Sequence, residues 1–111
     1  MKLPNFENAV IDIAKLRDYC LNPSHRRGQY KARVFAAALG LSAADAEELQ
    51  AAIAAAIGYE EAMATKEDQY GQRYVVDFRM RRAGEQQAQV RTMWIIRARE
   101  DFPRLTSCYV P

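Results

Sequence analysis

The strongest constraint on the fold is a pair of apolar segments near the end of the chain, Val90–Ile96 and Pro103–Tyr109. In the first segment two sets of side chains alternate, as they do on the two faces of a strand. One set is Val90, Thr92, Trp94 and Ile96, and the other is Arg91, Met93, Ile95 and Arg97. The polar stretch Ala98–Asp101 is too short for a crossover helix, so we predict an antiparallel hairpin. Trp94, the single tryptophan, should lie near the centre of the core.

Three helices are predicted upstream of this hairpin, at about 13–21, 29–39 and 43–57. Asp12 is a favourable N-cap for the first helix. Gly40 stands where the second helix needs a left-handed terminator. Ser42–Asp45 resembles a capping box, with aspartate in place of glutamate, at the start of the alanine-rich third helix.

After Gly58 the apolar period changes from 3.6 to 2, with a half-buried strand predicted around Val76 and a turn at Asp68–Gly71. Ala62–Lys66 fits either a weak strand or a continuation of the third helix, and 3–11 fits an extended arm or an edge strand. We therefore predict an α+β fold, in which three N-terminal helices pack on a C-terminal antiparallel β-meander of three to four strands. Its predicted core comprises Leu16, Phe35, Leu39, Leu49, Ile53, Phe78 and Trp94.

Composition narrows the class of protein. The 111 residues, half of them hydrophobic, suit a single domain over 1–111 that buries roughly two thirds of its unfolded surface. No apolar run has the length of a membrane span, and the first residues lack a signal-peptide core, so we expect a cytoplasmic protein. Cys20 and Cys108 are expected to be free thiols. With one histidine and no Cys/His cluster, no metal or cofactor is expected.

The charge distribution indicates a nucleic-acid partner. Lysine and arginine exceed aspartate and glutamate by only 16 to 14, but the two signs are separated along the chain. The acids concentrate between Asp45 and Asp68, whereas bases cluster in Arg26–Arg33 and Arg79–Arg82. Most of these bases are arginines, which suit bidentate contacts to phosphate. A basic face opposite an acidic face is therefore expected.

A longer pattern of residues resembles a known family. It consists of His25, Gly28, a Lys31-Ala32 pair and Phe35 before a helix end, followed by Val90–Trp94 and Pro103–Tyr109. This succession resembles a bacterial family catalogued as a domain of unknown function, whose members resemble toxin modules of polymorphic toxins and toxin–antitoxin-like gene pairs. Their layout is similar to the barnase, EndoU, colicin and RelE-like ribonucleases. Two positions depart from the pattern: Arg26 replaces a proline, and Ser107 replaces a threonine.

The resemblance implies a metal-independent ribonuclease that acts on RNA, tRNA included, and a small antitoxin or immunity protein as partner. Such cleavage needs a base, an acid and cations for the phosphorane charge. His25 suits either of the first two roles. The predicted catalytic residues are His25, Lys31, Arg91, Ser107 and Tyr109, and the predicted substrate-binding residues are Arg27, Tyr30 and Thr92.

A second interpretation stays open at this point. The chain also fits a non-catalytic protein-interaction module, immunity-like or a subunit of a two-gene complex, whose arginines meet an acidic partner. His25 would then be an ordinary loop histidine, and the polar strand positions a solvated sheet face. Geometry discriminates between the two functions, because an enzyme needs His25, Lys31 and Arg91 within reach of one small ligand.

Overall fold

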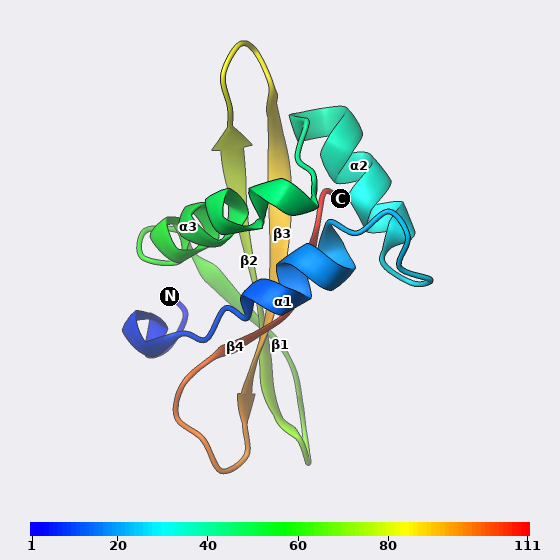
Figure 1. The fold of residues 1–111 in the computed structure, drawn as a ribbon. Helices are drawn as coiled ribbons and strands as arrows, with labels where there is room; N and C mark the ends of the chain where they lie inside the picture. The colour runs from blue at the N-terminus through cyan, green and yellow to red at the C-terminus, as the bar shows by residue number, and fades with distance from the viewer.

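The structure is a computed structural model that describes residues 1–111, and it confirms the α+β class (Figure 1). The helical elements are 3₁₀ helix η1 (Phe6–Asn8), α1 (Ile13–Lys15), π-helix η2 (Leu16–Cys20), α2 (Gln29–Leu39), 3₁₀ helix η3 (Ala43–Asp45) and α3 (Ala46–Ala56). The strands are β1 (Ala62–Asp68), β2 (Gly71–Arg81), β3 (Gln87–Arg97) and β4 (Arg104–Tyr109), which form one antiparallel sheet in the order β1-β2-β3-β4. None of the helices has the length and apolar character that crossing a bilayer requires.

The second and third helices begin and end where their local signals place them. Gly40 terminates α2 with a φ of 65°, in the left-handed region that favours glycine. The predicted capping box forms, because the backbone N–H of Ser42 donates to the Asp45 carboxylate over 2.9 Å. The first turn of the third helix is nevertheless 3₁₀, so that α3 itself starts at Ala46.

The first helix differs from its prediction. Asp12 caps it as expected, accepting from the backbone N–H of Ala14 over 2.9 Å. The α-helical geometry lasts for only one turn, after which the N–H of Leu21 donates to the carbonyl of Leu16, as in a π-helix. The spacing of apolar residues does not distinguish α-helical from π-helical hydrogen bonding here, because Leu16 and Cys20 are buried in either case. π-Helical turns are rare in proteins, and many of those that occur lie at functional sites.

The sheet resolves the open assignment at Ala62–Lys66 as part of a strand, since Ala62 pairs with Val76. The turn into β2 lies at Gln69-Tyr70, and it requires Gly71. A Cβ there would lie 2.1 Å from the carbonyl oxygen of Ile96, and the φ of 143° is one that other residues rarely adopt. The N-terminal arm is not an edge strand. It forms η1 and then a single parallel bridge between Val10 and Arg104.

The terminal hairpin forms as predicted, but one of its faces is altered by a β-bulge. Met93 pairs with Ser107 and Trp94 with Leu105, so Thr106 is the extra residue. Beyond the bulge Ile95 is only 8% exposed, although the alternation placed it opposite the core, whereas Ile96 is half-buried. At this point the N-terminal arm pairs with β4, since the backbone of Val10 forms hydrogen bonds on both sides of Arg104.

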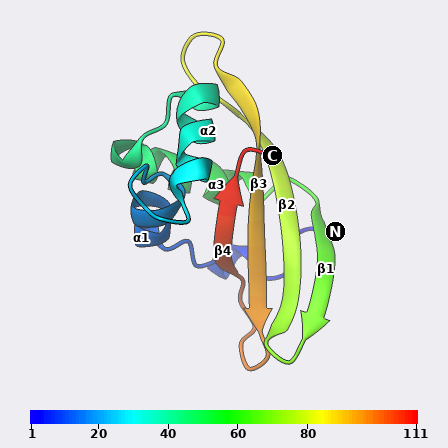
Figure 2. The same cartoon turned by 90° about the vertical axis from the view of Figure 1, so that its right-hand side faces the viewer.

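The helices cover one face of the sheet. In Figure 2 the four strands lie side by side, with α3 behind them and α1 and α2 beyond the β4 edge, and no helix lies in front. The covered face carries a core cluster that contains all seven predicted core residues. At its centre Trp94 is 1% exposed, and its indole N–H donates to the Thr92 hydroxyl over 2.8 Å. Thr92 in turn donates to the carbonyl of Val76 over 2.6 Å.

Replacing Leu49 with alanine is expected to lower the free energy of unfolding by about 2–5 kcal/mol, because Leu49 is fully buried and the change leaves a cavity. Urea denaturation measures the effect. Met63→Ala is the matched control, since Met63 is 68% exposed and its truncation should change stability by less than about 0.5 kcal/mol. Equal effects of the two substitutions would contradict the packing described above.

Replacing Thr92 with valine keeps the volume of the side chain but removes the acceptor of the Trp94 indole. A buried donor without a partner costs about 1–3 kcal/mol, so the variant should unfold at a correspondingly lower urea concentration. Thr65→Val is the control, because Thr65 is exposed on β1. A Thr92→Val variant as stable as this control would show that the indole finds another acceptor.

Candidate functional site

Several of the predicted site residues meet around Tyr19, which lies on the π-helical turn η2. The Lys31 ammonium donates to the Tyr19 hydroxyl over 2.8 Å, and its Nζ atom lies 4.9 Å from the centre of the Tyr19 ring. The same Nζ atom lies 6.0 Å from the centre of the Tyr109 ring, at the end of β4. The His25 ring packs edge-on against Tyr19, with 4.8 Å between ring centres. We call Tyr19, His25, Lys31 and Tyr109 the Lys31 cluster.

The loop before α2 holds His25 in a fixed orientation. Its Nδ1 atom accepts from the backbone N–H groups of Arg27 and Gly28, over 3.0 and 2.9 Å. The neutral ring therefore has its proton on Nε2, which is left as a hydrogen-bond donor. In this geometry the ring has no free nitrogen lone pair. Of the two roles expected for His25, base or acid, that of general base therefore does not fit. A role as donor to an anion does fit.

Gly28 allows this loop to pack directly on the π-helical turn. A Cβ at Gly28 would lie 2.0 Å from the carbonyl oxygen of Tyr19, far inside contact distance. The histidine, the glycine and the lysine of the sequence pattern therefore have one structural role in common. All three surround Tyr19, a residue for which the helical spacing predicted only a place on the buried face of a helix.

The positive charge of Lys31 has no carboxylate partner. Lys31 is half-buried, yet it takes part in none of the ion pairs of the protein. The chain has no aspartate or glutamate between Asp18 and Asp45. The remaining cations of this stretch, Arg26, Arg27 and Arg33, are also free of ion pairs. The loop and α2 thus form an uncompensated basic region next to two tyrosines.

Arg91 is different, because a carboxylate neutralises it. Its Nε and Nη2 atoms both donate to Asp77 on the neighbouring strand, each over 2.9 Å. The Asp77 carboxylate, and after it the adjacent Tyr109 hydroxyl, raise the pKa of Arg91 above its usual value. Arg91 pairs with Tyr109 in the sheet register, so it joins the Lys31 cluster only through that ring. Its guanidinium is thus already held by Asp77 and lies beside Tyr109.

The other predicted site residues are less central. Thr92 lies inside the core with its hydroxyl already bonded, out of reach of any ligand. Tyr30 is 65% exposed on α2, and the Arg33 guanidinium lies 5.6 Å from its ring centre. Ser107 has a buried hydroxyl oxygen without a hydrogen-bond partner. This hydroxyl lies beside the Cys20 thiol and favours its ionised form.

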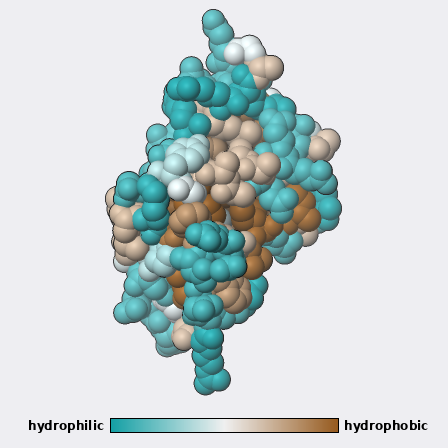
Figure 3. Space-filling model, turned by 90° about the vertical axis from the view of Figure 1, so that its left-hand side faces the viewer, coloured by the Kyte–Doolittle hydropathy of each residue, from teal (hydrophilic) through white to brown (hydrophobic).

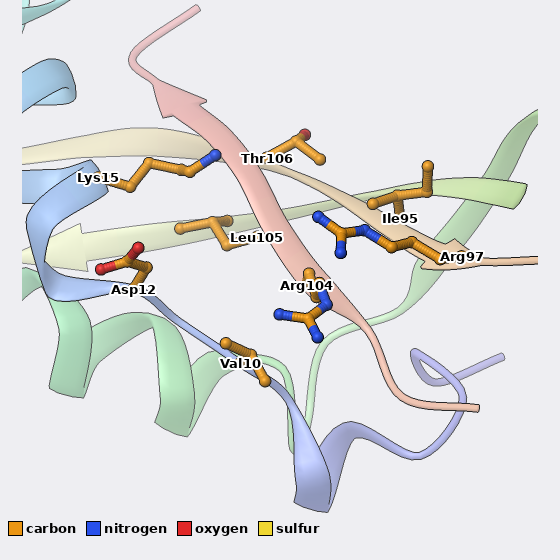
Figure 4. Close-up of a pocket in the computed structure, with 8 residues that line it drawn as sticks. All are labelled: Val10, Asp12, Lys15, Ile95, Arg97, Arg104, Leu105 and Thr106. Carbon is orange, nitrogen blue, oxygen red and sulfur yellow. The ribbon is translucent and has the colours of Figure 1, made fainter. Parts of the chain in front are cut away.

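A groove of about 390 Å³ lies farther along β4 (Figure 4). It is lined by Val10, Asp12, Lys15, Ile95, Arg97, Arg104, Leu105 and Thr106. Arg104 is bonded to Glu100 over 2.9 Å, and Asp12 is occupied as a helix cap. Lys15 and Arg97 form no ion pair. The groove is a second basic site on the same strand.

Not every basic side chain belongs to a binding surface. Arg82, in the second basic stretch of the sequence, binds Glu48 with two hydrogen bonds of 2.8 and 2.9 Å and the carbonyl of Leu39 with a third of 2.8 Å. These bonds connect the start of the β2–β3 turn to Glu48 on α3 and to the end of α2. The side of the molecule that lies on the left in Figure 1 is not uniformly charged either. Its middle is apolar, and its two ends are hydrophilic (Figure 3).

A family model matches residues 2–111, which is nearly the whole chain, and its description is Domain of unknown function (DUF6883). No match was found among curated proteins or among solved structures.

Substituting Gly28 with alanine is expected to displace the loop from Tyr19, because the new Cβ would overlap the Tyr19 carbonyl. Such overpacking costs about 1–3 kcal/mol, and the amide NMR signals of residues 19–31 should shift. Gly58→Ala is the control, because its Cβ would meet its nearest atom at an ordinary 3.4 Å. Unshifted signals around Tyr19 in Gly28→Ala would contradict the close packing.

Proposed function

Because the chain belongs to the family described as Domain of unknown function (DUF6883), whose description names no activity, we propose a function from the geometry of the site. The domain binds the phosphate backbone of RNA at the Lys31 cluster and cleaves it without a metal, as a toxin-like ribonuclease. The observation that carries this proposal is the half-buried Lys31 ammonium, which has a phenol beside it and no carboxylate.

A half-buried cation is normally paired with an anion. Lys31 has three N–H donors, of which one binds Tyr19. The remaining Lys31 donors, the Nε2–H of His25 and the Tyr19 hydroxyl all belong to groups packed around the Tyr19 ring. A phosphate, with its several acceptor oxygens, matches such a set.

Aromatic rings and the groove favour a single strand of RNA as the ligand. Tyr109 lies beside Lys31, and Tyr30 is exposed one position before it. Bases stack on such rings while cations follow the backbone. Strand β4 runs from the groove at Arg104 to the cluster at Tyr109, so phosphates a few nucleotides apart in one strand can occupy both basic sites.

The cleavage step in this proposal depends on charge stabilisation. The 2′-hydroxyl of the bound nucleotide attacks the phosphorus, and negative charge accumulates on the phosphorane oxygens. Lys31 and the Nε2–H of His25 stabilise that charge, while the 2′-hydroxyl proton passes to water. The bond between phosphorus and the 5′-oxygen then breaks, which leaves a 2′,3′-cyclic phosphate, and the departing 5′-oxygen takes a proton from water. No cofactor takes part. A toxin of this kind acts on bacterial cytoplasmic RNA, tRNA included, and a small antitoxin or immunity protein would hold it inactive.

A second candidate function is that of a non-catalytic module that binds an acidic partner protein. The observation that favours it is the bonding of His25, whose Nδ1 atom already holds the loop together. His25 would then be structural, and the unpaired cations between Arg26 and Arg33 would face the partner. The two functions differ in whether RNA binds at all.

Removing the charge of Lys31 is expected to weaken RNA binding. With fluorescently labelled single-stranded RNA in EDTA, Lys31→Met should raise Kd by about tenfold or more, because a hydrogen bond to a charged group contributes about 1.5–3 kcal/mol. The log–log salt slope should fall by about 0.7 for each phosphate that the variant no longer neutralises. Lys66→Met is the control, since Lys66 is exposed on β1. No RNA affinity in the wild type at low salt would favour the interaction module.

Substituting His25 with asparagine separates binding from cleavage. The asparagine side-chain oxygen can accept the two backbone N–H groups that Nδ1 now accepts, but the Nε2–H donor is removed. His25→Asn should therefore bind RNA only slightly less tightly than the wild type, since it loses one neutral hydrogen bond worth about 0.5–1.5 kcal/mol. It should cleave RNA much more slowly, as gel electrophoresis of the products would show. His25→Ala also removes the hydrogen bonds that hold the loop, so it should bind less tightly as well. Full cleavage by His25→Asn would exclude the proposed role.

A further inference from the structure

Two thiols from opposite ends of the chain meet beneath the Lys31 cluster. Cys20 closes the π-helical turn η2, and Cys108 lies in β4. Both are free and buried, and both belong to the core cluster. The two elements that carry them, η2 and β4, pack against each other, and the pKa of each thiol depends on the other thiol. The family resemblance and the proposed function use neither of them.

The neighbours of this pair connect it to the site. Tyr19 precedes Cys20 and Tyr109 follows Cys108, and the Lys31 ammonium lies against both tyrosine rings. The positive charge of Lys31 also acts on both sulfur atoms. The buried Ser107 hydroxyl, which has no hydrogen-bond partner, is next to Cys20. An ionised sulfur would give that hydroxyl an acceptor, and a buried donor without one is unfavourable.

We propose that Cys20 and Cys108 form an oxidisable dithiol, a modification site at which a hydroperoxide converts the pair into an intramolecular disulfide. Its basis is the burial of both thiols in one cluster where η2 packs on β4. The Lys31 cation lies against the tyrosines that flank the two thiols, and the buried Ser107 hydroxyl beside Cys108 in the chain has no partner. Thiols of this kind react where a positive environment favours the thiolate, whereas isolated buried cysteines are inert.

The chemistry is balanced by one peroxide per pair. The Cys20 thiolate attacks one peroxide oxygen, so that an S–O bond forms, the O–O bond breaks and, for hydrogen peroxide, the departing hydroxide takes a proton to become water. The Cys108 sulfur then attacks the Cys20 sulfenic acid, forming the S–S bond and releasing a second water. The two thiols are oxidised and the peroxide is reduced. A small-molecule dithiol reverses the change by exchange.

The order of the two steps follows from the environment of each sulfur. Hydrogen bonding from Cys108, and then the charge of Lys31 and the Ser107 hydroxyl, lower the pKa of Cys20 to about 7 against the opposing effect of burial. Hydrogen bonding to Cys20 and burial raise the pKa of Cys108. Cys20 is therefore the attacking sulfur and Cys108 the resolving one. Because both are buried, the peroxide reaches them when the short turn 16–20 opens locally.

The disulfide would tie η2 to β4 and hold Tyr19 and Tyr109 in place on either side of Lys31. If the proposed function holds, oxidation thus fixes the geometry of the RNA site. This consequence rests on the proposed function, but the dithiol itself does not. Its test therefore measures sulfur chemistry without RNA.

The experiment treats the full chain with hydrogen peroxide and measures free thiols and intact mass under non-reducing conditions. The wild type should lose both thiols, remain monomeric and become lighter by two hydrogen atoms, and dithiothreitol should restore it. Cys108→Ser should accumulate a sulfenic acid on Cys20 that dimedone traps. Cys20→Ser should leave Cys108 unmodified at the same peroxide concentration. Covalent dimers, unreacted thiols or first reaction at Cys108 would each overturn the proposal.

The pH dependence of the wild-type reaction keeps the test independent of whether the variants fold. Because the pKa of Cys20 is lowered, the thiolate is present above that pKa and disappears as the pH falls through it. The rate of thiol loss should rise through about pH 7 and then level off. The same protein in urea is the control, and its rate should rise through the ordinary cysteine value of about 8.5. Identical pH profiles for folded and unfolded protein would overturn the proposal.

Discussion

The hydrogen bond between the Trp94 indole and the Thr92 hydroxyl is the interaction on which the rest of the structure depends. A tryptophan at the centre of a core this small needs an acceptor, because a buried N–H without one is costly. Thr92 supplies it from the same strand and donates its own proton to the Val76 carbonyl on the next strand. With both polar groups satisfied, the helices can pack on this face of the sheet. A threonine predicted to bind substrate thus has a structural role.

Charge pairing distinguishes the Lys31 cluster from the two arginines that the protein neutralises most fully. Arg91 on β3 is paired with Asp77, and Arg82 after β2 is paired with Glu48. The loop and α2 lack such partners, because no acidic residue occurs between Asp18 and Asp45. The net charge of +2 therefore conceals a local excess of positive charge at the Lys31 cluster. That local excess, and not the overall composition, is what favours an anionic ligand.

The junction between η2 and β4 places the two tyrosines of the Lys31 cluster close to the two cysteines. It positions Tyr19 and Tyr109 around Lys31 on its surface and Cys20 against Cys108 beneath it. Gly28 allows the loop to pack on the same turn, because only glycine leaves room for the Tyr19 carbonyl. Any change at this junction, whether by substitution or by oxidation, should therefore reach the cluster. The π-helical geometry of residues 16–20 is consistent with a site whose local structure is constrained by function.

The sequence by itself determined the elements whose signals are local, and only the tertiary structure decided which residues meet across elements. Capping residues and a terminating glycine located α2 and α3, alternation located β2 and β3, and the apolar stripes identified the core. A family pattern also linked His25, Gly28 and Lys31, without showing that they share Tyr19 as a neighbour. Beyond the bulge at Thr106, by contrast, Ile95 is buried although the alternation placed it opposite the core. Strand register places Asp77 beside Arg91. The packing of η2 on β4 brings Cys20 and Cys108 into one buried cluster. Such contacts depend on register, bulges and the angles between packed elements, and the physical chemistry of a single segment does not contain that information.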